Sequence, residues 1–175
     1  MSDIQYPIGR FQPQPAPLPA DARAGHVDRI AALPGRARTA VAGLDDPQLD
    51  TPYRDGGWSP RQITHHLADS HLNAFVRIKL ALTEDHPTIK PYDQERWARQ
   101  ADVTAVPVAA SLDILGGLHE RWVRLLRSLS EADFARTVKH PEIGDIDVDF
   151  LLQMYAWHGD HHVTQIERLR ERRGW

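Results

Sequence analysis

The 175-residue chain is predicted to fold as an all-α bundle of four main helices, with a small β-hairpin and an extended, proline-rich N-terminal arm. Apolar residues recur at helical spacing in four long segments, good capping residues begin two of them, and turn-forming clusters separate them. Hydrophobic residues make up 41% and charged residues 26% of the chain, as in ordinary globular proteins. The length suits one domain over residues 1–175.

The N-terminal segment, residues 1–19, contains five prolines and shows no helical period. Because proline fixes φ and lacks a backbone donor, we expect an extended arm packed on the bundle. A first helix should begin near Ala20. Pro34 and Gly35 are expected to interrupt it, with a second helical piece that runs to about Leu44.

The second main helix has a well-marked start. Ser59 is a good N-cap, Pro60 suits the first helical position, and Gln62 stands three residues after the cap. Apolar positions at helical steps carry this helix to about Leu82. A long, proline-punctuated connection follows, with one short helix expected around residues 92–99, and connections of this length are often functional.

The C-terminal part contains two more main helices. The third is predicted over residues 108–128, and Ser130 with Asp133 caps a brief helical turn after it. Two short β-prone runs flank a turn at residues 141–144, which predicts a small hairpin. Asp147 is a plausible N-cap for the fourth helix, placed over residues 148–170.

Composition excludes several classes of function. The formal charge of -3 gives no basic excess for binding nucleic acid. The chain has no cysteine, which rules out disulfides, thiolate metal ligands and a cysteine nucleophile, and which suits the cytoplasm. Neither a secretory signal nor an apolar run of the roughly 20 residues that cross a membrane is recognisable. We therefore expect a cytoplasmic protein with no membrane or nucleic-acid partner.

A cluster of histidines near the C-terminus predicts a metal site. His158 and His162 are four residues apart, so they share one helical face and can bind one ion together. That face also carries apolar residues, which indicates that it looks into the bundle. His161 could instead pair with His158 at a spacing of three, but its own face is more mixed, so His162 is preferred.

A third ligand is available from the second helix. His66 lies on the apolar side of that helix, whereas His65 is about 100° away and His71 lies further round. Three neutral imidazoles from two facing helices leave coordination positions for water or substrate, and a water bound there can ionise near neutral pH. The alternative is an exposed histidine pair with no metal at all.

Other enzyme signatures are absent or weaker. Gly159 follows His158, so the glutamate of an H-E-x-x-H protease is missing, and no G-x-S-x-G elbow presents a serine. Asp69 and Asp160 could orient a ligand imidazole, but surface helix positions are the preferred explanation for both. Trp58 and Trp157 are expected to be core or packing residues in preference to platforms for a substrate. Three residues of the long connection could line a pocket mouth and meet an anionic substrate, or form an ordinary loop: Lys90, Tyr92 and Arg96.

Several blocks of sequence together resemble one known family. They are "LDTPYRDGGWSPRQITHHLADSHLNAFVRIKLALTE", "IKPYDQERW", "LHERWVRLLRSL" and "YAWHGDHHVTQI". The chain is similar over almost its whole length to the YfiT branch of the DinB superfamily. This resemblance implies a DinB-type four-helix bundle, a homodimer, and one divalent ion, zinc or nickel, held by His66, His158 and His162. Gln165 departs from the family, where another histidine is frequent.

The resemblance leaves three functions open. Members of that branch are classed as metal-dependent hydrolases, which implies a small-molecule substrate attacked by activated water. Wider relatives transfer low-molecular-weight thiols such as bacillithiol, which implies a thiol cofactor ionised at the metal. A metal-stabilised binding or stress protein without turnover is the third. No catalytic residue beyond the ligands is predicted.

Overall fold

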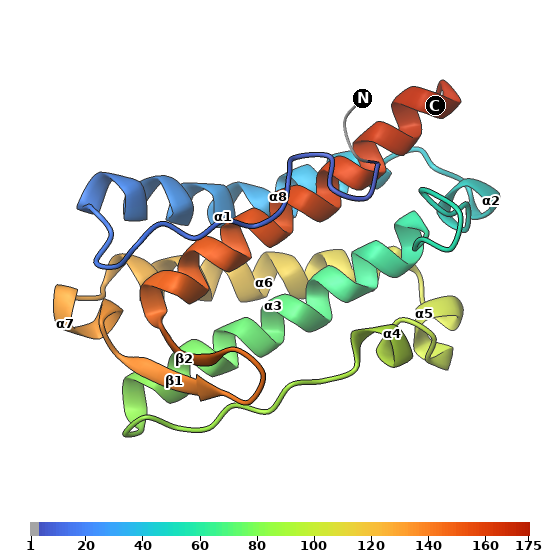
Figure 1. Ribbon diagram of the computed structural model, residues 1–175. Helices are drawn as coiled ribbons and strands as arrows, with labels where there is room; N and C mark the ends of the chain where they lie inside the picture. Colours follow the sequence, from blue (N-terminus) through green and yellow to red (C-terminus); the bar gives the residue numbers. More distant parts are fainter. Residues whose placement is uncertain (1–3) are drawn as a thin grey trace.

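The computed structural model describes residues 4–175 and shows four long helices packed side by side, with a two-stranded hairpin at one end (Figure 1). The long helices are α1 (Ala20–Val41), α3 (Pro60–Thr83), α6 (Val108–Arg127) and α8 (Val148–Arg173). Four short helices occur in the connections: α2 (Asp46–Leu49), α4 (Gln94–Trp97), α5 (Ala101–Ala105) and α7 (Glu131–Phe134). Helices α1 and α3 each pack against both α6 and α8. The predicted helical bundle is confirmed.

The two helices that carry the histidine clusters begin where the sequence predicts. The Ser59 side chain accepts a hydrogen bond from the backbone of Gln62, and the Gln62 side chain accepts one from the backbone of Ser59, which forms a capping box at the start of α3. The Asp147 carboxylate accepts a hydrogen bond from the Phe150 amide at the start of α8. These caps fix the register in which both helices present their histidines.

The first helix differs from its prediction. Helix α1 is continuous through Pro34, so the expected interruption at Pro34 and Gly35 is wrong. Proline has no N–H to offer the carbonyl of the residue four positions earlier, Ile30. In the bundle another donor is available, because Nδ1 of His119 on α6 lies 2.7 Å from that carbonyl oxygen. The contact from His119 thus replaces the hydrogen bond that Pro34 cannot donate, so the helix continues although the sequence pattern predicts a break.

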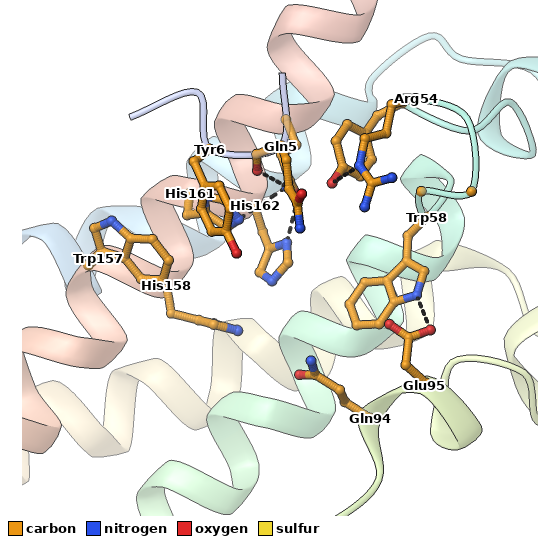
Figure 2. Close-up of a pocket in the computed structure, with 14 residues that line it drawn as sticks. Gln5, Tyr6, Arg54, Trp58, Gln94, Glu95, Trp157, His158, His161 and His162 are labelled. Carbon is orange, nitrogen blue, oxygen red and sulfur yellow. Dashed lines mark hydrogen bonds between the residues drawn. The ribbon is translucent and has the colours of Figure 1, made fainter. Parts of the chain in front are cut away.

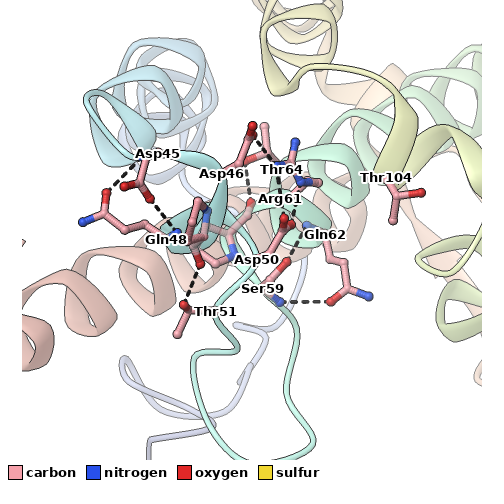
Figure 3. A network of polar contacts seen from close by, with 12 residues as sticks. Asp45, Asp46, Gln48, Asp50, Thr51, Ser59, Arg61, Gln62, Thr64 and Thr104 are labelled. Carbon is pink, nitrogen blue, oxygen red and sulfur yellow. Dashed lines mark hydrogen bonds and ion pairs between the residues drawn. The ribbon is translucent and has the colours of Figure 1, made fainter.

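The connection between α1 and α3 is more ordered than the expected turn-rich segment, because it contains α2. The Arg61 side chain at the start of α3 is buried and binds two carboxylates, those of Asp46 and Asp50 (Figure 3). A buried guanidinium is stable only when such partners satisfy it. This network fixes the loop that leads to Trp58. The next connection likewise contains α5, which was not predicted, beside the expected helix α4.

The hairpin follows its prediction. Strands β1 (Thr137–His140) and β2 (Gly144–Asp147) are antiparallel, and Val138 stands opposite Ile146. Both of these side chains are buried against the bundle. The hairpin therefore closes one end of the core.

The N-terminal arm runs along α8 (Figure 1). The amide of Leu18 donates to the buried Asp149 carboxylate, and the indole of Trp157 donates to the Gly9 carbonyl. Nearer its start, the arm's Gln5 carbonyl accepts from Nε2 of Gln165. The predicted arm spans residues 1–19, of which residues 1–3 lie outside the described part. The described arm thus lies on the helix that carries two of the predicted ligands.

Two apolar clusters fill the bundle, and a polar layer separates them. On α8 the first cluster ends at Ala156 and the second begins at Val163, whereas on α3 the second ends at Ala68 and the first begins at Ala74. Histidines fill much of these gaps: His71, His158, His161 and His162. Buried polar groups are costly unless they find partners, so this layer calls for hydrogen bonds or a ligand. Within residues 4–175, no helix is both long and apolar enough to cross a bilayer.

Candidate metal centre

Three histidine side chains from α3 and α8 converge in this polar layer. One ring nitrogen each of His66, His158 and His162 lies within 4.8 Å of those of the other two. His66 and His162 are buried, and His158 is half-buried. The helices bring together the three side chains predicted as ligands, one from α3 and two from consecutive turns of α8. Their role as metal ligands remains a prediction.

The geometry and protonation of these side chains fit a divalent ion. Two nitrogens bound to one ion at about 2.0–2.1 Å stand roughly 2.9–3.4 Å apart for the usual bond angles. Nε2 of His66 lies 3.1 Å from Nε2 of His158, within that range. Burial, followed by the neighbouring histidines, lowers the pKa of all three imidazoles well below the ordinary value. Each ring is therefore neutral at pH 7 and keeps a lone pair for a metal.

Gln165 positions one of these rings. Its Oε1 lies 2.8 Å from Nδ1 of His162, and an amide oxygen can only accept, so this nitrogen carries the proton. The amide cannot turn over freely, because its Nε2 donates to the Gln5 carbonyl at 3.0 Å. Nε2 of His162 is then the unprotonated nitrogen. The departure from the family pattern at Gln165 supplies a hydrogen-bond acceptor of the kind that metal-binding histidines usually have.

Two further histidines are connected to the candidate ligand His158. From the sequence, His71 is not expected to be a ligand, and His119 is not singled out. His71 is fully buried, and its Nε2 lies 3.3 Å from Nδ1 of His158. On its other side, Nδ1 of His71 lies 3.0 Å from Nε2 of His119 on α6. His71 lies outside the buried face that is expected for α3 if this helix has a single inward direction. Because α3 packs against both α6 and α8, its buried arc is wide enough to include His71.

The remaining histidines of the two clusters take other roles. His161 is buried, stacks on Trp157 with ring centroids 4.6 Å apart, and lies 3.1 Å from Nε2 of Gln165. It is outside the three-histidine group, in agreement with the preference for His162. His65 turns toward α6, where its Nδ1 lies 2.8 Å from Oγ of Ser111.

A pocket opens next to the candidate ligands (Figure 2). Its lining includes His158 and His162 together with residues of the arm, the loop before α3, and α4. Trp58 forms one wall, with its ring centroid 4.6 Å from that of His66, and its Nε1 donates to Glu95 at 3.2 Å. Trp58 is thus a wall of the site as well as the packing residue that the sequence suggested.

The weaker candidates do not reach the ligands. Asp160 forms ion pairs with Arg29 and Arg36 of α1, so it holds α8 to α1 instead of orienting an imidazole. Burial raises the pKa of Asp69 to about 6, but its carboxylate is not a member of the three-histidine group. The long connection does contribute to the pocket, though through other residues than the three suggested: Gln94 and Glu95.

Gly159 between the candidate ligands lets α8 approach α1 closely. A Cβ at this position would stand 2.6 Å from Cδ2 of the core residue Leu33. We expect Gly159→Ala to lower the free energy of unfolding by about 1–3 kcal/mol, because a packed core must shift to admit the methyl group. Urea unfolding measures this. A glutamate at this position, as in a protease-type motif, would meet the same contact.

Gly117 on α6 provides the matched control. It is exposed, and a Cβ there would meet nothing within 4 Å. Gly117→Ala should therefore raise stability by up to about 1 kcal/mol, since alanine favours a helix over glycine. Equal stability of the two alanine variants would show that the approach of α8 to Leu33 is not tight.

Fold and site together define a helical-bundle protein with a three-histidine cluster beside a pocket. The DinB superfamily model matches residues 29–166. A protein of Geobacillus thermodenitrificans named "Putative metal-dependent hydrolase" is 49% identical over 98% of this chain and 97% of its own length. A protein of Bacillus cereus with the same name is 46% identical over the full length of both. The chain belongs to the DinB superfamily.

Solved structures agree with the observed fold. YfiT from Bacillus subtilis, described as "a probable metal-dependent hydrolase with an unusual four-helix bundle topology", superposes with a TM-score of 0.95 at 40% identity, over 98% of both chains. TT2238, described as a four-helix bundle protein, has a TM-score of 0.57 at 19% identity, over 83% of this chain and 98% of its own. The second likeness supports the fold alone.

Proposed function

We propose that the protein is a metal-dependent hydrolase of a small molecule, with one divalent ion held by His66, His158 and His162. The convergence of three neutral imidazoles beside a pocket is the observation that carries this proposal. The names of the relatives from Geobacillus and Bacillus support it. Three imidazoles suit both zinc and nickel. We take zinc as the first choice of ion and nickel as the second.

The surrounding residues suit this chemistry. A divalent ion on three neutral ligands makes a water or thiol nucleophilic near neutral pH. His66, His158 and His162 hold the ion without reducing its charge, and Gln165 keeps one ring in the binding tautomer. Trp58 from the loop before α3 and Trp157 from α8 give the pocket aromatic walls, which can bind the apolar part of a substrate.

Metal analysis is the first test of the proposal. Purified protein should contain about one zinc or nickel ion per chain, and the ion should be removable by a chelator. Hydrolysis of small esters or amides should stop on chelation, return with zinc, and be absent from His66→Ala. Full activity in the chelated protein would contradict the proposal.

Thiol transfer is a second candidate, because a chain without cysteine would receive its nucleophile from a cofactor. Turnover of a fluorogenic electrophile that depends on an added low-molecular-weight thiol, and that is lost in His66→Ala, would favour this reaction. Cleavage without any thiol would favour hydrolysis. If chelation lowers the melting temperature and neither substrate is consumed, the ion serves to join α3 and α8 in a binding protein.

A further inference from the structure

We propose that His119 and His71 are positioning residues. They link a backbone carbonyl of α1 to the candidate ligand His158 by a chain of hydrogen bonds, in which each ring donates from Nδ1. This chain fixes the tautomer of His158. This tautomer leaves Nε2 of His158 unprotonated, on the side that faces Nε2 of His66. This inference rests on the proposed metal site. It assigns a purpose to two buried histidines outside the three-histidine group.

The chain of hydrogen bonds ends at the carbonyl of Ile30, which fixes the tautomer of the first ring. Its carbonyl oxygen lies 2.7 Å from Nδ1 of His119, and a carbonyl oxygen can only accept, so this nitrogen must carry a hydrogen. Pro34 removes the N–H that would otherwise approach the Ile30 carbonyl within α1. The carbonyl therefore depends on His119 for a partner, as a buried backbone acceptor requires. The proline inside the helix and the histidine on α6 complement each other.

This first hydrogen bond determines which nitrogen donates in each of the next rings. A neutral imidazole has one donor and one acceptor, so Nε2 of His119 accepts, and Nδ1 of His71 at 3.0 Å donates. Nε2 of His71 accepts in its turn, and Nδ1 of His158 at 3.3 Å donates. Only Nε2 of His158 is left with a lone pair, and it faces Nε2 of His66 at 3.1 Å. Each ring thus has one tautomer that satisfies its neighbours.

Burial makes this arrangement strict. His71 and His119 have exposed fractions of 0% and 2%, so bulk water hardly reaches either ring. Reversing one ring would place two donors or two acceptors face to face in the interior, which costs free energy. Both rings also touch Trp122, so simple packing is the competing explanation. Packing alone would accept an apolar residue of similar size and would not select a tautomer.

Two variants of His71 separate hydrogen bonding from packing. Leucine fills similar space without an acceptor, whereas the amide of glutamine reaches as far as Nε2 and can accept from His158. We expect His71→Leu to weaken zinc binding roughly 10–100-fold, the usual effect of losing a partner of a ligating histidine. His71→Gln should stay within a few-fold of the unmodified protein. Competition with a chromophoric chelator measures both affinities.

The tautomers can also be measured without metal. Long-range 1H–15N correlation spectra of the unmodified, metal-free protein should show His71 and His119 protonated at Nδ1. Protonation of either at Nε2 would overturn the proposal, as would equal zinc affinities of His71→Leu and His71→Gln. If the variants do not fold, the spectra alone decide. If the unmodified protein binds no zinc, the proposed function fails while the tautomers remain measurable.

Discussion

His162→Ala is expected to lose its bound metal, and His161→Ala is expected to keep it. These neighbours on α8 are both buried, so the two substitutions disturb the core in a similar way. They therefore test whether His158 binds the metal together with the histidine four residues later or with the one three residues later. His162 belongs to the three-histidine group, whereas His161 stacks on Trp157 outside it. Loss of a ligand should exceed the roughly 10–100-fold weakening that loss of an outer partner causes. His161→Ala should weaken binding by less than that.

Metal content after gel filtration and zinc affinity by chelator competition measure this difference. Unfolding curves of the metal-free variants check that both retain the fold. Retention of a full ion in His162→Ala would exclude the proposed ligand set. Loss of the ion in His161→Ala but not in His162→Ala would move the site to the spacing of three.

The first residues of α3 and α8 were predictable because their causes are local. Ser59 and Asp147 satisfy backbone donors of their own helices, which needs no knowledge of the rest of the chain. The shared face of His158 and His162 was predictable for the same reason, since one helix fixes their relation. The pairing with His66 needed only one assumption, that apolar helical faces look inward.

The contacts that escaped prediction depend on helix packing. The donor from His119 to the Ile30 carbonyl joins α6 to α1, so the sequence around Pro34 could not reveal that α1 continues. His71 is buried because α3 has two neighbours instead of one. The apolar period of a helix gives the middle of its buried face but not its width. Residues at the edge of that face are therefore the ones that sequence reasoning misplaces.

Acidification should destabilise the metal-free protein steeply. Burial lowers the pKa of His119 and of His161 from 6.5 to about 4. Between these two pH values the unfolded chain binds protons at these histidines and the folded chain does not. Stability contributed by these groups is full above pH 6.5 and is lost as the pH falls toward 4. From pH 7 to pH 5 the loss is about 2 kcal/mol for each group.

Other groups modify this loss without reversing it. Burial also lowers the pKa of the three candidate ligands, which adds to the loss in the same direction. Asp69 acts in the opposite direction, because burial raises its pKa to about 6 and the folded chain takes up its proton first. One carboxyl that is only half-buried cannot offset several buried imidazoles. The net expectation is a decline of at least about 4 kcal/mol, a large part of a typical domain's stability of roughly 5–15 kcal/mol.

Urea unfolding of the chelated protein at pH 7, 6 and 5 measures the decline, and a histidine variant identifies its origin. In His161→Gln one titrating group is gone, so the slope of stability against pH should fall by up to about 1.4 kcal/mol per pH unit. Gly117→Ala changes no titrating group, and it should shift the whole curve without changing its slope. A stability that stays constant from pH 7 to pH 5 would mean that the buried histidines take up protons in the folded state. The polar layer would then be hydrated, and the neutral ligands on which the metal site depends would be absent at mildly acidic pH.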